Sequence, residues 1–400
     1  MKDNNFRKHG DKLLFVLALA ILVTALFRQG WGKTISQAVA PTMVFTQWWQ
    51  DDHEKEALEK LIQEFEGIHS NIKIILKTVS YEDLRSDLFD PAETPPGDIL
   101  ALDPLWLPEL IKRGTIEGSI ESSIESSDQE ASEAPRLSFI DVLYYNVGIL
   151  KKAGFTKPPK TRSEFLSCAK AVSGGIAMDL NCSRGIHDDV YPWIWSAGVQ
   201  LIKDGKPAVN SKPIIDSLSF LASLNSERLI VPGAFSSDEK KLDNFISGKA
   251  AFMIAPISDL KLVSKGMGDG AFGITSVPVP DNYAGKSFYG AAGWTIGVYS
   301  ASAHKEEANL FAAFLSEKAS LLSEETDAIP CIDAPPATEI LQSKAWDIAI
   351  AGENAKDFSA IPGEHELEGI FREELTALFE GKSTASGAAE AIQKRWEAKF

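Results

Sequence analysis

Strand-like and helix-like segments alternate along this chain from Met43 onward, and this alternation restricts its fold more than any other feature. The apolar, β-prone segments Met43–Thr46, Ile72–Leu76 and Asp98–Leu102 are typical of buried strands. Between the first two, Ala57–Phe65 carries apolar residues at the spacing of an amphipathic helix. Because strands separated by helices form βαβ units, the pattern predicts an α/β fold with a mostly parallel sheet and helices on both faces.

The length and charge of the chain narrow its organisation and its partners. Four hundred residues exceed what one simple core organises, so we expect two lobes. The composition, 44% hydrophobic and 24% charged, is that of a globular protein. The net charge of −16, with no basic patch to offset it, argues against a nucleic-acid partner and disfavours a polyanionic ligand.

The N-terminal segment has the pattern of an export signal. Basic residues between Lys2 and Lys12 precede an uncharged apolar run, Leu13–Phe27. As a helix this run would reach about 22 Å, less than the roughly 30 Å of a bilayer's hydrocarbon layer. We therefore interpret residues 1–41 as a signal peptide and expect an extracytoplasmic protein, with an uncleaved membrane anchor as the alternative.

The cysteines give no sign of a metal site. The chain has three, Cys168, Cys182 and Cys331, and their spacing matches no metal-binding motif. We expect three buried thiols, with a Cys168–Cys182 disulfide as the alternative in an oxidising compartment. No metal or cofactor is expected.

Two corners, each placed where a strand ends and a helix begins, combine aromatic with acidic side chains. They comprise Trp48, Trp49, Gln50 and Asp51 in the first corner, and Asp103 and Trp106 in the second. Ligands of open α/β sheets bind outside the carboxyl ends of the strands. An indole covers the apolar face of a sugar ring while Asp or Gln bonds its hydroxyls, so these corners predict a carbohydrate site. The alternative is core packing for the indoles and helix capping for the carboxylates.

The adjacent indoles Trp48 and Trp49 pose a question of direction. Neighbouring side chains on a strand point to opposite faces. We therefore expect one indole to pack in the core and the other to line the site, although the sequence does not say which.

Five segments in matching order resemble one protein family. They are "EKEALEKLIQEFE", "GDILALDPLW", "VLYYNVGILKKAGFTKPPKTRSEF", "FISGKAAFMI" and "GWTIGVYSASAHKEEANLFAAFL". Together they are similar to the extracellular solute-binding proteins of ABC importers, in the sugar-binding, maltose-binding-like branch. The resemblance extends from about Met43 to the C-terminus.

The resemblance implies a type II periplasmic-binding-protein fold, in which two α/β lobes joined by crossover segments close on a ligand in the cleft between them. The implied boundaries are 42–138 and 290–328 for lobe one, 144–280 and 332–400 for lobe two, and 139–143, 281–289 and 329–331 for the hinge. It also implies a monomer that delivers a sugar to the membrane permease subunits of an ABC transporter.

Further site residues come from the later segments. By resemblance, Ser138 and Asp141 contribute ligand contacts, and Asp141 would be costly to bury without a partner. Trp294 follows Gly290-Ala-Ala-Gly293, where the family often places a glycine turn facing the ligand. Trp193 and Trp195 alternate at strand-like or turn spacing, so we expect them to share a face and one of them to reach the cleft.

The chain departs from the family pattern at two places. The sugar-stacking Trp that commonly follows the "AAFMI" strand is replaced by Ala255–Ser258, and the usual Y-G-L-P piece before Ser138 is missing. These departures favour a different or smaller sugar over a long malto-oligosaccharide.

Two other functions stay open at this point. An exported glycoside hydrolase needs only two well-placed carboxylates, and the chain has 56 acidic residues. However, the sequence contains no H-E-x-x-H, G-x-S-x-G or Walker A motif, so we expect no enzyme. A solute-binding partner of a sensor receptor is the second alternative.

Overall fold

The structure is a computed structural model, and it describes residues 41–50, 52–89, 95–117, 137–172, 177–180, 186, 189–235, 240–326, 328, 340–355 and 364–400. The N-terminal signal segment, Asp51, Cys182, Cys331 and the 329–331 part of the hinge therefore lie outside the described residues. In the described part of the chain, no helix has the length and hydropathy that a membrane crossing requires.

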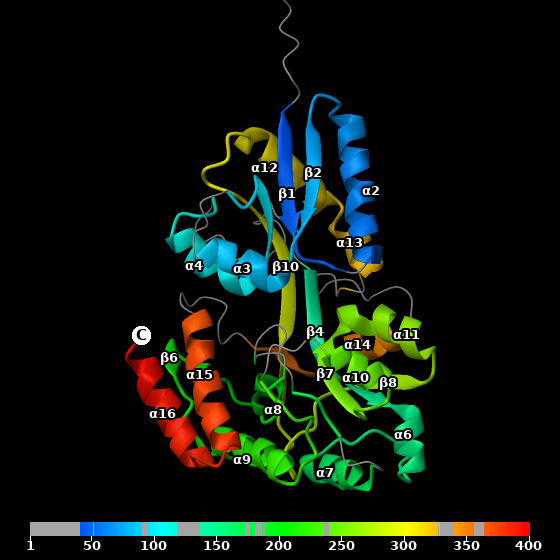
Figure 1. The fold of residues 1–400 in the computed structure, drawn as a ribbon, viewed down its shortest axis with the longest axis vertical. Coiled ribbons are helices and arrows are strands. Elements are labelled where there is room, and N and C mark those ends of the chain that lie inside the picture. Colours follow the sequence, from blue (N-terminus) through cyan, green and yellow to red (C-terminus); the bar gives the residue numbers. More distant parts are fainter. Residues whose placement is uncertain are drawn as a thin grey trace, which may run out of the picture.

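The described elements form two lobes, one above the other in Figure 1. Lobe one contains β1 (Thr42–Gln47), α2 (Asp52–Ile68), β2 (Lys73–Thr78), α3 (Tyr81–Phe89), β3 (Ile99–Leu102), η1 (Pro104–Trp106), α4 (Leu107–Lys112), α12 (Lys305–Glu317) and α13 (Ala319–Thr326). Two strands, β4 (Leu137–Asn146) and β10 (Ala291–Val298), run between the lobes.

Lobe two contains the remaining helices and strands. They are α6 (Val147–Lys152), α7 (Arg162–Ala171), α8 (Tyr191–Trp195), β5 (Ile202–Lys203), β6 (Lys206–Pro207), α9 (Lys212–Ser226), α10 (Lys241–Ile246), β7 (Phe252–Pro256), η3 (Ile257–Asp259), α11 (Leu260–Met267), β8 (Phe272–Thr275), β9 (Phe288–Tyr289), α14 (Ile340–Ala351), β11 (Glu353–Asn354), α15 (Glu364–Phe379) and α16 (Ala385–Glu397).

One sheet of seven strands connects the lobes, in the order β2-β1-β3-β10-β4-β7 with β8 also paired to β4. β1 is parallel to β2 and β3, as the βαβ pattern predicts. The first half of β4 pairs with β10 and the second half with β7 and β8, all antiparallel. The prediction of a mostly parallel sheet is therefore wrong outside lobe one, because β4 descends into lobe two while β7 and β8 run back toward lobe one.

This strand direction positions the site. The carboxyl ends of β1, β2 and β3 point from lobe one toward lobe two, and the carboxyl end of β7 points from lobe two toward lobe one. Segments that follow these strands consequently meet between the lobes.

The hydrophobic core is divided into two clusters, but the division does not coincide with the lobes. The first cluster fills lobe one and continues along β4 to Met253 and Phe272, on one face of the lobe-two strands. The second covers the opposite face, with Phe252 and Ile254, beneath α7, α8, α9, α15 and α16. The crossing strand β4 is thus buried against both clusters, which anchors the connection between the lobes.

Local sequence signals for helix ends are confirmed where they were clearest. Thr161 caps α7 through the backbone N–H of Glu164, and Glu164 completes the capping box. Gly154 and Gly248, which follow α6 and α10, adopt φ of 92° and 75°, a left-handed conformation in which glycine avoids the strain of a Cβ.

Candidate functional site

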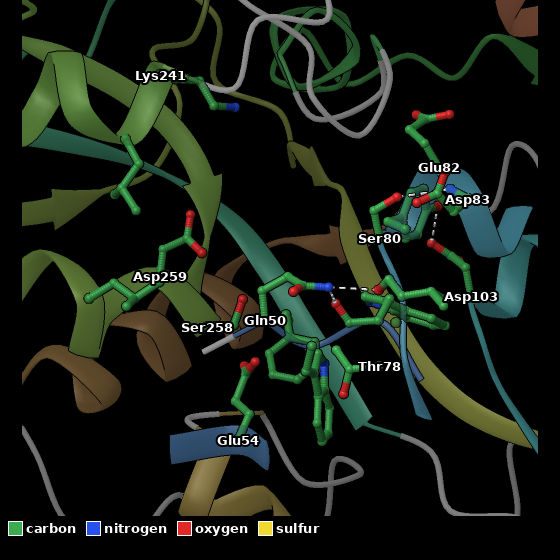
Figure 2. A pocket seen from close by; sticks show the side chains of 18 residues that line it. Gln50, Glu54, Thr78, Ser80, Glu82, Asp83, Asp103, Lys241, Ser258 and Asp259 are labelled. Atoms are coloured by element: carbon green, nitrogen blue, oxygen red, sulfur yellow. Dashed lines mark hydrogen bonds between the residues drawn. The ribbon is translucent and has the colours of Figure 1, made fainter. Parts of the chain in front are cut away.

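A cleft of about 730 Å³ opens between the two lobes. Its lobe-one wall consists of segments that follow β1, β2 and β3, and its lobe-two wall consists of α10 and the segment after β7. Figure 2 shows Lys241, Ser258 and Asp259 on one side of this space and Gln50, Ser80 and Asp103 on the other. The described lining residues are Trp48, Trp49, Gln50, Glu54, Thr78, Val79, Ser80, Tyr81, Glu82, Asp83, Asp103, Phe139, Lys241, Leu242, Ser258, Asp259, Leu262 and Gly293.

Both indoles of the first corner line this cleft. Trp48 is 9% exposed, packs edge-on against Tyr81 at 5.4 Å and lies tilted against Trp106 at 5.4 Å. Trp49 is 6% exposed and stacks on Trp294 at 4.6 Å. The expectation that only one of them faces the cleft is wrong, because β1 ends at Gln47 and strand alternation does not extend to the two tryptophans.

Two glutamines hold this corner in shape. The buried Gln47 amide donates to Thr78 Oγ1 at 2.6 Å and accepts from the backbone N–H of Trp49. The Gln50 amide lines the cleft and donates to the Val79 carbonyl at 2.6 Å. These bonds tie the end of β1 to the end of β2, so the indoles are fixed before a ligand arrives.

The second corner supplies a fixed carboxylate. Asp103 caps η1 by accepting from the Leu105 N–H at 2.9 Å, and its other oxygen accepts from the Tyr81 hydroxyl at 2.9 Å. Capping and cleft lining are therefore combined in this residue. Trp106, by contrast, is buried against Trp48 and Tyr81, and the structure does not bring it to the cleft.

The lobe-two wall contains residues that the sequence analysis missed. Lys241 reaches the cleft from α10, and its ammonium pairs with the buried Asp189 carboxylate at 3.0 Å. Ser258 and Asp259 follow the carboxyl end of β7. Applying the strand-end rule to every strand would have identified Ser258 and Asp259, whereas no local signal marks Lys241.

Trp294 does not line the cleft, although it supports a residue that does. It lies in β10 rather than in a turn, it is fully buried, and its ring stacks on Trp49 and meets Phe45 edge-on. The neighbouring Gly293 lines the cleft, where a Cβ would come within 2.4 Å of the Pro104 side chain. Strand alternation in β10 thus turns the glycine toward the cleft and the indole away from it.

Ser138 and Asp141 lie elsewhere on β4. Ser138 is half-buried opposite Gly293, and it is Phe139, on the other face of the strand, that lines the cleft. Asp141 is buried and lines a second cavity of about 280 Å³, together with Ser196 and Asp347. The structure therefore does not bring either residue to the main cleft.

Trp193 and Trp195 belong to the one-turn helix α8 and not to a strand, so the expectation that they share a face is wrong. Trp193 is fully buried against Phe165 and Phe220, and its carbonyl accepts from Arg162, whose pKa burial lowers to about 10. Trp195 is buried where a Cβ on Gly290 would meet its ring at 2.4 Å. Residues two apart in a helix point in nearly opposite directions, which explains the failure of the prediction.

The described lining of the cleft combines flat aromatic surfaces with carboxylates, hydroxyls and the Lys241 ammonium group. Within the described ranges, no three His, Cys, Asp or Glu side chains converge as metal ligands. The arrangement suits a small polar molecule that has both an apolar face and many hydroxyls.

Comparisons with known proteins agree with this geometry. The family model of the bacterial extracellular solute-binding proteins matches residues 51–320. The GacH receptor of Streptomyces glaucescens, solved unliganded and with acarbose, is 17% identical, with a TM-score of 0.75 over 90% of this chain and 98% of its own.

Two further solved structures share the fold. Maltose-bound MalE3 of T. maritima is 20% identical, with a TM-score of 0.73 over 90% of this chain and 100% of its own. An ABC transporter solute-binding protein of Thermotoga lettingae, bound with α-D-tagatose, is 18% identical, with a TM-score of 0.74 over 90% and 99%. At these identities the likeness shows the fold.

Proposed function

The chain belongs to the bacterial extracellular solute-binding protein family, whose members are the solute-binding components of ABC transporters and not enzymes, and we propose that its solute is a carbohydrate held in the cleft between the lobes. The carbohydrate is bound by Trp48 and Trp49 on the lobe-one side and by Asp259 on the lobe-two side. Gln50 and Asp103 complete the set of polar contacts.

The observation that carries the proposal is the corner at the end of β1, where two indoles line a cleft beside fixed polar groups. An indole covers the apolar face of a pyranose, and carboxylates and amides accept or donate hydrogen bonds to its hydroxyls. The cleft volume of about 730 Å³ falls within the range typical of small-molecule sites.

The proteins of similar fold support a sugar ligand, since those described above were solved with acarbose, maltose and tagatose. Ser258 stands in the segment where the family commonly places a sugar-stacking Trp. We therefore propose a monosaccharide or disaccharide in preference to a long malto-oligosaccharide.

We also propose how capture and delivery proceed. Lobe one (42–138, 290–328) and lobe two (144–280, 332–400) close on the sugar by bending at residues 139–143, 281–289 and 329–331. The closed form docks on ABC permease subunits at the outer face of the membrane, after export directed by residues 1–41. In support, the pairing partner of β4 changes from β10 at residues 137–140 to β7 at residues 141–145.

A thermal-shift panel of monosaccharides, disaccharides, sugar phosphates and polyols tests the ligand class. A sugar at a hundred times its Kd raises the free energy of unfolding by roughly 2.7 kcal/mol, which is readily detected. The same panel is run on Asp259→Asn, a cleft variant, and on Asp216→Asn, a control on the exposed face of α9 whose carboxylate pairs with Lys212 one turn away.

We expect a neutral sugar to stabilise the wild type and Asp216→Asn equally and Asp259→Asn less. A panel in which no carbohydrate raises the melting temperature contradicts a sugar ligand. Equal stabilisation of all three proteins contradicts the placement of the sugar beside Asp259.

A further inference from the structure

A buried ion pair joins the two lobes. Arg85 lies on α3 of lobe one and Glu368 on α15 of lobe two, 283 positions apart in the sequence. Their Nη2 and Oε2 atoms are 3.4 Å apart, and the two side chains are 6% and 2% exposed. In Figure 1 the start of α15 extends upward toward α3 and α4, which agrees with this contact.

The Glu368 carboxylate is fixed by lobe two independently of Arg85. Its Oε1 accepts from Arg372 Nη2 at 2.6 Å, one turn along the same helix, and from the backbone N–H of Ile186 at 3.0 Å. One oxygen thus serves lobe two, and the other is presented to lobe one. A carboxylate positioned in advance loses little side-chain entropy when Arg85 arrives.

The same carboxylate is connected to the cleft wall. Ile186 is buried, and its carbonyl accepts from the backbone N–H of Asp189 at 3.3 Å. Asp189 in turn holds the Lys241 ammonium that lines the cleft. The Arg85–Glu368 pair is therefore connected, through Ile186 and Asp189, to the lysine that lines the lobe-two wall of the cleft.

From these contacts we propose that Arg85 and Glu368 form an interlobe latch, which favours the closed arrangement of the lobes before any solute binds. Opening the lobes separates the two residues and returns Arg85 to water. A pair shielded from solvent attracts more strongly than an exposed one, and Glu368 keeps its lobe-two partners in both arrangements. This inference rests on the lobe closure that the proposed function includes.

The latch has a consequence for affinity. When only a fraction of the molecules is in the binding-competent arrangement, the apparent Kd rises in proportion as that fraction falls. By raising the closed fraction of the free protein, the latch tightens solute binding without touching the solute.

The test uses the purified chain without any added solute, so it does not depend on a carbohydrate being the ligand. Small-angle X-ray scattering compares the wild type with Arg85→Gln and with Arg113→Gln. Arg113→Gln is the matched control, because it removes the same charge from lobe one, and the contacts of Arg113 with Glu109 and with the Phe89 carbonyl both lie within lobe one. We expect Arg85→Gln to raise the ratio of open to closed molecules about tenfold, through loss of one hydrogen bond between charged groups. The mean radius of gyration should increase accordingly, and Arg113→Gln should match the wild type.

A second variant distinguishes loss of the ion pair from general damage to the fold. Glu368→Gln removes the charge but keeps a side-chain oxygen for the Ile186 N–H, so it should open the lobes to a similar extent. The double variant Arg85→Gln/Glu368→Gln should open them no further than either single variant, because the pair is already broken. Arg85→Lys, which retains the charge, should restore part of the closed population.

Superimposable ligand-free scattering from the wild type, Arg85→Gln and Glu368→Gln overturns the latch. So does additive opening in the double variant. Failure of the thermal-shift panel to identify a sugar affects the proposed function alone, since no arm of this test contains a sugar.

Discussion

Trp294→Ala separates a structural role from a role in the cleft. The ring is fully buried, stacks on Trp49 at 4.6 Å with an interplanar angle of 18°, and meets Phe45 at 6.4 Å. Removing a fully buried Trp side chain costs about 3–5 kcal/mol. Two aromatic contacts are lost with it, so we expect about 4 kcal/mol, a large part of the roughly 5–15 kcal/mol that stabilises a typical domain.

Trp294→Phe is the matched variant. No acceptor among the described residues bonds the indole Nε1, so a phenyl ring gives up no protein hydrogen bond there. It retains a surface for Trp49, and we expect it to cost about half as much as Trp294→Ala. Urea unfolding followed by circular dichroism measures both free energies of unfolding.

The result that refutes this reasoning is a Trp294→Ala protein of nearly wild-type stability that has lost carbohydrate binding. That outcome would place the indole in the cleft, as the family resemblance implied. A substantial loss of stability, partly recovered in Trp294→Phe, supports the buried position behind Trp49.

Three further predictions concern single groups. Burial raises the pKa of the Cys168 thiol to about 11. Iodoacetamide near neutral pH should therefore leave Cys168 unlabelled until urea unfolds the chain, as mass spectrometry of the digested protein would show. Labelling of Cys168 in the folded protein contradicts this. A hydrogen bond from the Ser163 hydroxyl lowers the pKa of Asp281, so this carboxylate contributes stability above its unfolded pKa that is lost as the pH falls through its folded pKa. Asp281→Asn should therefore melt below the wild type at neutral pH, and this deficit should shrink as the pH falls below about 4, the ordinary pKa of an aspartate. A deficit that does not change with pH argues otherwise. Asp103→Ala loses a helix cap and the bond from Tyr81, which should cost about 2 kcal/mol in urea unfolding, whereas a change below about 0.5 kcal/mol contradicts the capping role.

The helices and strands were predictable where local signals are strong. β4 occupies Leu137–Asn146 as expected, and α7 begins at its predicted Thr161 cap. Periodicity and capping depend on residues within one or two turns, so the sequence contains what is needed to place them. The antiparallel pairing of β7 and β8 with β4 depends on contacts more than a hundred positions apart, which no local pattern encodes.

The site was predictable only in part for the same reason. Trp48, Trp49 and Asp103 follow strand ends, and their sequence position brings them to the cleft. The direction of the Trp294 ring depends on the register of β10 against β4, where Trp294 pairs with Leu137. Trp193 could have been placed correctly, because Pro192 at the start of a turn indicates a short helix and not a strand.

The most direct test of a carbohydrate site beside Trp48 and Trp49 is isothermal titration calorimetry. The wild type and Trp48→Ala are titrated with the sugar that gives the largest thermal shift. Both proteins are titrated well below their melting temperatures, so that the lost packing against Tyr81 does not unfold the variant. We expect saturable binding to the wild type with one sugar per chain, and a Kd about tenfold higher for Trp48→Ala, from loss of a stacking contact of roughly 1 kcal/mol or more. An unchanged Kd in Trp48→Ala contradicts the assignment of this cleft as the carbohydrate site.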